Sequence, residues 1–153
     1  MQKKLKSILV AVDGSPHSDR ATDFAANLAQ QSDAVLLILH VRAPVLTSEA
    51  RNELEQLERM EHHHQTEYEI IQESGQQIAL AAEQRARKSG AQRTEVMVEV
   101  GDPAKWIADM AHARQVDLVV LGRRGLGPIA QLLSGSVSAK LAQISECPVV
   151  IVP

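Results

Sequence analysis

The sequence ILVAVDGSP at residues 8–16 decides the fold. Its first five residues form a nearly continuous apolar run rich in β-branched types, the pattern of a strand buried on both faces. The polar residues that follow end this strand and start a helix, because Ser15 suits the N-cap and Pro16 the first helical position. Apolar residues at helical spacing continue to Gln31, so the strand is followed by an amphipathic helix.

The alternation of strand and helix continues through the rest of the chain. A second apolar strand covers residues 34–41, and the order strand, helix, strand implies parallel strands with a right-handed crossover. Three further strands are predicted at 94–100, 117–121 and 148–152, and two further helices at 103–113 and 136–145. The expected fold class is therefore α/β, an open five-stranded parallel sheet with helices on both faces.

The sequence also indicates the sheet edges and the middle of the chain. Residues 94–100 alternate as a half-exposed strand should, and Pro148 fits only an edge strand or a strand start. The polar stretch from Thr47 to Ser89 is expected to hold a surface insertion followed by the second crossover helix, which ends near Gly90.

Length and composition exclude several classes of protein. A chain of 153 residues with 44% hydrophobic residues predicts one domain over residues 1–153. A net charge of −3 argues against nucleic acid and anionic membranes as partners, and aromatic residues at 2% leave few stacking platforms for single strands. A lone Cys147, no secretory leader pattern and no apolar run of about 20 residues favour a cytoplasmic protein without a membrane span.

The segment from Gly122 to Ser138 carries the chemistry. It follows the fourth strand directly and leads into the last helix. Gly122 and Gly125 would let the backbone approach a ligand, and Gly135 precedes a helix start that exposes unpaired N–H groups. Such a site favours phosphate. Because Asp13 and Gly122 both follow strands directly, their loops would converge on one crevice if those strands are neighbours.

These glycines also carry a resemblance to a known family. Gly122, Gly125 and Gly135-Ser136 match the G-2x-G-9x-G(S/T) motif of ATP-binding universal stress proteins. Residues 6–15, the Leu39-His40-Val41 strand end and residues 147–152 are similar to that family as well, so the resemblance spans nearly the whole chain. It implies a Rossmann-like sheet with strand order 3-2-1-4-5, a homodimer and bound ATP. Mg²⁺ is expected to accompany the ATP.

The same resemblance implies a set of site residues. The nucleoside would lie at the ends of the first two strands, and the ribose and phosphates along the glycine motif. The candidates are Ala11, Val12, Asp13 and Val41 on the nucleoside side, Gly122 and Gly125 beside the ribose and phosphates, and Gly135, Ser136, Val137 and Ser138 at the triphosphate. Arg123 and Arg124 occupy variable positions of the motif and are further candidates for phosphate contact. Asp13 is also the candidate metal ligand, with a capping or turn role as the alternative.

Other interpretations of the glycine segment have less support. Residues 125–130 satisfy G-x-G-x-x-A, but Pro128 interrupts this stretch and only one strand follows, so a dinucleotide site is not expected. A Walker A loop is excluded because no Gly-Lys-Ser/Thr occurs. A purely structural turn, in which the glycines only shape the backbone, stays open.

Histidines and the cysteine give weaker signals. The run His62-His63-His64 after Glu61 could hold a metal, although adjacent histidines point in different directions on a helix. His40 and His112 are expected to be packed or surface residues. Cys147 is expected to be a small core residue rather than a nucleophile.

Three classes of function stay open. The first is an ATP-binding regulator that reports a stress or energy state to a protein partner, and the intact motif favours it. The second is slow ATP hydrolysis, for which the sequence shows no residue that would act as the general base. The third is a nucleotide-independent interaction module. In each class a homodimer is expected through the apolar C-terminal strand, because bare sheet edges invite pairing.

Overall fold

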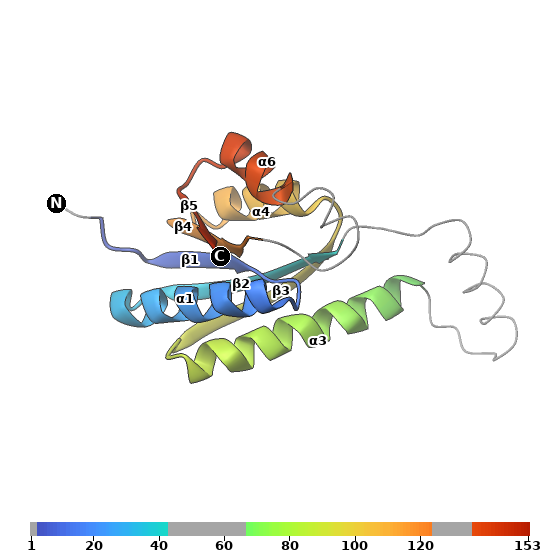
Figure 1. Ribbon diagram of the computed structural model, residues 1–153, viewed down its shortest axis with the longest axis horizontal. Helices are drawn as coiled ribbons and strands as arrows, with labels where there is room; N and C mark the ends of the chain where they lie inside the picture. The colour runs from blue at the N-terminus through green and yellow to red at the C-terminus, as the bar shows by residue number, and fades with distance from the viewer. Residues whose placement is uncertain (1–2, 43–66, 124–135) are drawn as a thin grey trace, which may run out of the picture.

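The computed structural model describes residues 3–42, 67–123 and 136–153, which form a five-stranded sheet with helices packed against it (Figure 1). The strands are β1 (Ser7–Ala11), β2 (Val35–Arg42), β3 (Arg93–Val100), β4 (Leu118–Gly122) and β5 (Val149–Val152). All four pairings are parallel and the order is β3-β2-β1-β4-β5. The predicted fold class and strand order are therefore confirmed, and no strand boundary differs from prediction by more than one residue.

Helices cover both faces of the sheet. They are α1 (Pro16–Ser32), α3 (Glu67–Lys88), α4 (Pro103–Ala113) and α6 (Ser136–Ile144). Helices α1 and α3 lie on one face, and α4 and α6 lie on the other (Figure 1). The expected second crossover helix is α3, whereas residues 47–66, with the His62–His64 run, lie outside the described residues.

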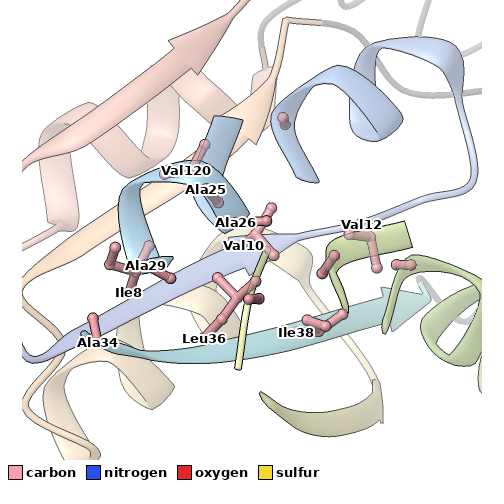
Figure 2. Packing of buried hydrophobic residues seen from close by; sticks show 14 of the residues in the cluster. Ile8, Val10, Val12, Ala25, Ala26, Ala29, Ala34, Leu36, Ile38 and Val120 are labelled. Carbon is pink, nitrogen blue, oxygen red and sulfur yellow. The ribbon is translucent and has the colours of Figure 1, made fainter. Parts of the chain in front are cut away.

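Two aliphatic clusters fill the space between the sheet and its helices. The first, here called the α1/α3 core, joins β1, β2 and β4 to alanines of α1 and α3 (Figure 2). The second, here called the α4/α6 core, joins the opposite side chains of the same strands to Ala104, Ile107 and Ala111 of α4 and Leu141 of α6. Because alternate residues of a strand point to opposite faces, the near-continuous apolar runs supply both cores.

Local capping fixes where α1 and α4 begin. Ser15 is the N-cap of α1, and its hydroxyl accepts a hydrogen bond from the Ser18 N–H at 3.1 Å. Asp102 is the N-cap of α4 and accepts one from the Ala104 N–H at 3.1 Å. Each cap satisfies an N–H that the helix itself leaves unpaired.

The two edge strands are the ones expected from the sequence. β3 forms one edge, and β5 forms the other beside β4. Among the described residues, no helix is long and apolar enough to cross a membrane.

Candidate functional site

The end of β1 is held tightly against the end of β2. Ala11 is the last residue of β1, and Val12 continues the pairing, since its N–H donates to the Leu39 carbonyl at 2.9 Å. The Val12 carbonyl accepts a hydrogen bond from Nδ1 of His40 at 2.7 Å. Both backbone groups of Val12 are therefore fixed to β2, and the next residue, Asp13, stands at the carboxyl edge of the sheet.

Asp13 shapes a turn, and one of its carboxylate oxygens has no hydrogen-bond partner among the described residues. Its Oδ1 accepts a hydrogen bond from the Ser15 N–H at 2.9 Å, and its own N–H donates to Oγ of Ser18 at 3.1 Å. The turn role proposed as the alternative for Asp13 is therefore present. Within the described residues, Oδ2 has no hydrogen-bond partner, so a ligand role is compatible with the turn.

Gly122 ends β4 and touches the first turn of α1. A Cβ at this position would lie 2.7 Å from the His17 carbonyl carbon and 2.8 Å from the His17 oxygen. Backbone atoms cannot move aside as a flexible side chain can, so no larger residue fits without a shift. The next residue, Arg123, is exposed, and its N–H donates to the Val152 carbonyl at 2.8 Å.

The start of α6 supplies the remaining described candidates. Val137 is half-buried against the α4/α6 core, and Ser138 is only 8% exposed. Ser136 is the first residue of α6. Arg124, Gly125 and Gly135 lie outside the described residues, so the predictions for them are not tested by the structure.

The described candidates gather at one end of the sheet. Strands β1 and β4 are neighbours, with Ala11 opposite Leu121, so Val12 and Gly122 follow side by side. Ala11, Val41 and Val137 all pack against the α4/α6 core. Because α6 runs from the end of β4 back to the start of β5, its first turn lies at the same carboxyl edge. The fold thus brings together the predicted nucleoside side and the described part of the phosphate side.

An ion pair between a lysine of α6 and the N-cap aspartate of α4 connects the two helices on one face of the sheet at this edge. Lys140 of α6 forms an ion pair with Oδ2 of Asp102, whose Oδ1 caps α4. The Lys140 ammonium is the main cause that lowers the pKa of the Asp102 carboxyl below its ordinary value. The pair connects residues 38 positions apart, and nothing in the local sequence pattern indicated it.

The other titratable candidates lie away from this edge or within the core. His40 is 5% exposed, which confirms a packed residue, and His112 pairs at the surface with Glu146 at 2.7 Å. Cys147 is half-buried against the α4/α6 core, as expected of a small core residue. A surface hollow beside His112 and Cys147 lies at the opposite, amino edge of the sheet. Among the described residues, no three histidine, cysteine or acidic side chains gather as a metal site.

Comparison with known proteins identifies the family. The family model described as "Universal stress protein family" matches residues 4–153. Universal stress protein YxiE of Bacillus subtilis is 36% identical over 146 residues, which cover 95% of this chain and 97% of that protein. A universal stress protein of Thermus aquaticus is 34% identical over 155 residues, covering 96% of this chain and 98% of that protein.

A solved structure extends the likeness to three dimensions. The crystal structure of a universal stress protein in complex with cAMP is 30% identical and has a TM-score of 0.70, with 98% of each chain covered. The family match, the relatives and the shared fold agree along nearly the whole sequence. The chain belongs to the universal stress protein family.

Proposed function

We propose that this protein binds ATP, together with Mg²⁺, at the carboxyl edge where β1 and β4 end, and that occupancy of the site regulates a protein partner. The observation that carries the proposal is the convergence of Asp13, Gly122 and the first turn of α6 on that edge. The glycine motif is intact in the sequence, and a family member 30% identical to this chain is known in complex with cAMP.

Each part of the site has a proposed role. Ala11, Val12, Asp13 and Val41 would contact the nucleoside, because they end the two central strands. The motif residues from Gly122 to Ser138 would surround the phosphates, which the exposed N–H groups at the start of α6 favour. Arg123, which is exposed beside the end of β4, offers a cation to the phosphates.

The described residues offer one carboxylate ligand for a divalent cation, and the phosphates of the nucleotide would supply the others. Mg²⁺ is usually held by one or two carboxylates together with substrate phosphates, and Oδ2 of Asp13 is a carboxylate oxygen that the turn leaves without a partner in the described part of the chain. Bound there, the ion would neutralise phosphate charge. The chain's own contribution would be to hold this carboxylate at a fixed position.

Calorimetric titration tests the proposal. The protein, stripped of co-purified nucleotide, is titrated with ATP and Mg²⁺, with AMP and with cAMP. Micromolar ATP binding that weakens sharply for AMP supports a triphosphate site. Absence of binding by all three nucleotides would refute the proposal and favour the interaction module.

A matched pair of variants tests the role of Asp13. Asp13→Asn removes the charge but keeps an Oδ1 acceptor for the Ser15 N–H, so the turn should survive. We expect ATP affinity in the presence of Mg²⁺ to fall about tenfold. Asp33→Asn is the control, since it removes the same charge from the left-handed C-cap of α1, which asparagine tolerates, at the opposite edge. Equal affinity in both variants would exclude the proposed role of Asp13.

A cAMP-binding protein is the second candidate function. The observation that favours it is the complex of the family member with cAMP. A cyclic monophosphate does not need the whole triphosphate-binding segment. The same titration separates the two candidates, because tighter binding of cAMP than of ATP would favour the second.

We also propose that the protein forms a homodimer through β5. This strand is a sheet edge, its valines are only half-buried, and Ile151 is 45% exposed. Ile144 of α6, near the same edge, is 42% exposed. Pairing of β5 with its copy would cover this apolar surface and satisfy the backbone groups of the edge.

Light scattering tests the dimer. Ile151→Lys should shift the protein from dimer to monomer at micromolar concentration, because a charge would enter the apolar pairing surface. Leu80→Lys is the matched control, since Leu80 of α3 is similarly exposed at 42% but lies away from β5. A wild-type monomer, or loss of the dimer in both variants alike, would contradict the proposal.

A further inference from the structure

His40 is the one side chain among the described residues that is buried with a polar atom unsatisfied. It lies near the end of β2 and is 5% exposed. Its Nδ1 is 2.7 Å from the Val12 carbonyl, whereas its Nε2 has no hydrogen-bond partner in the described part of the chain. A buried polar atom without a partner is unfavourable, so the position calls for a reason other than packing alone.

The contact with Val12 fixes the state of the ring. A carbonyl oxygen can only accept a hydrogen bond, so Nδ1 must carry the hydrogen, and in the neutral ring Nε2 is left with a lone pair. On its other side the ring faces Gly75 of α3, where a Cβ would lie 3.0 Å from Cδ2 of His40. The imidazole is thus enclosed between the strand ends and α3.

This hydrogen bond acts on the backbone that leads into the candidate site. Val12 already donates its N–H to Leu39, so His40 provides the second tie from β2. The following residue is Asp13, whose carboxylate is set by the turn with Ser15. Without the donor on His40, the buried Val12 carbonyl would lose its partner and the backbone before Asp13 could move.

We propose that His40 is a positioning residue of the nucleotide site, which holds the Val12 carbonyl so that the nucleoside side of the site keeps its geometry. The inference rests on the proposed nucleotide binding. His40 itself touches no ligand in this proposal, because its ring is buried beneath the strand ends and packed against α3.

Two variants separate positioning from a merely structural role. Asn places an amide N–H on Cγ, where histidine carries Nδ1, so His40→Asn keeps a donor for Val12 although it fills less space. His40→Leu fills more of the space and removes the unsatisfied Nε2, but it has no donor. The larger loss of nucleotide affinity should therefore occur in His40→Leu and the larger loss of stability in His40→Asn.

The expected result is a crossed pattern. ATP affinity should fall about tenfold in His40→Leu and stay within roughly threefold of wild type in His40→Asn. The melting temperature should fall more in His40→Asn, because the smaller side chain leaves a cavity. If affinity instead follows the melting temperature in both variants, the residue is only structural and the inference is overturned.

The outcomes also separate this inference from the proposed function. If the wild-type protein binds no adenine nucleotide, both are overturned. If the wild type binds ATP and His40→Leu binds it equally well, only the positioning role is overturned. Nitrogen-15 NMR of the wild-type ring is a further test that does not depend on any variant folding. A hydrogen on Nδ1 is expected, and a ring without a hydrogen on Nδ1 would overturn the inference.

Discussion

Replacing Gly122 with alanine should destabilise the protein through a contact with helix α1. The new Cβ would lie 2.7, 2.8 and 2.9 Å from the carbonyl carbon, the oxygen and the Cβ of His17. An ordinary contact requires about 3.5 Å, so the end of β4 and the first turn of α1 must separate by roughly 0.8 Å. Two of the three atoms belong to the backbone, and a rotamer change of His17 cannot relieve them.

The expected loss follows from this overpacking. Inserting a methyl group into a packed contact lowers the free energy of unfolding by about 1–3 kcal/mol. For a chain of this size the melting temperature should fall by roughly 2–12 °C. Urea unfolding followed by circular dichroism measures the first quantity, and a thermal scan measures the second. A Gly122→Ala protein whose free energy of unfolding stays within about 0.5 kcal/mol of wild type would refute the close approach of β4 and α1.

The same displacement should reach the candidate site. The first turn of α1 contains Ser18, whose Oγ accepts the hydrogen bond from the Asp13 N–H. A shift of that turn would move Asp13 without any change in phosphate contacts. Reduced nucleotide binding in a Gly122 variant is therefore no evidence that Gly122 touches the nucleotide, and Asp13→Asn is the more direct test.

Three further changes test the core, the cap and the acid response. Leu141→Ala should lower the free energy of unfolding by about 2–5 kcal/mol in urea titration, because this fully buried side chain anchors α6 to the sheet. Ser15→Ala should lower the same quantity by roughly 1 kcal/mol, since the hydroxyl caps α1 by accepting from Ser18. The Lys3 ammonium, and after it two backbone N–H groups, hold the pKa of the Asp117 carboxyl below its ordinary value. The ionised carboxylate therefore stabilises the folded protein above the unfolded-state pKa, and this stabilisation is lost as pH falls through the folded-state pKa. Asp117→Asn should therefore flatten the fall of the melting temperature between about pH 5 and pH 3, and an unchanged slope would exclude this contribution.

Most of the fold could be predicted from the sequence because its strands are buried on both faces. Residues 8–12 are apolar throughout and residues 34–41 are apolar except for His40, which distinguishes both runs from surface elements. Cap residues such as Ser15 and Asp102 marked where the helices begin. The strand order could not be predicted from any local sequence pattern and was inferred from the family resemblance.

The contacts that hold the site could not be predicted, because they join distant residues. His40 and Val12 are 28 positions apart, and their hydrogen bond depends on the register of β1 against β2. In the sequence, His40 is simply a polar residue at the end of an apolar strand. The contact of Gly122 with His17 depends in the same way on how α1 crosses the end of β4.

These contacts change how the glycine motif should be interpreted. From the sequence, the absence of a side chain at Gly122 is attributed to a ligand that lies close to the backbone. In the described residues, it is the backbone of His17 in α1 that lies close to Gly122. The two explanations are compatible, because a residue without a side chain permits the close approach of a helix and of a ligand alike. A variant can separate them only if it keeps the backbone in place. No Gly122 variant meets this condition, because a Cβ there would displace α1, so nucleotide binding is better tested by Asp13→Asn, which keeps the acceptor that the turn uses.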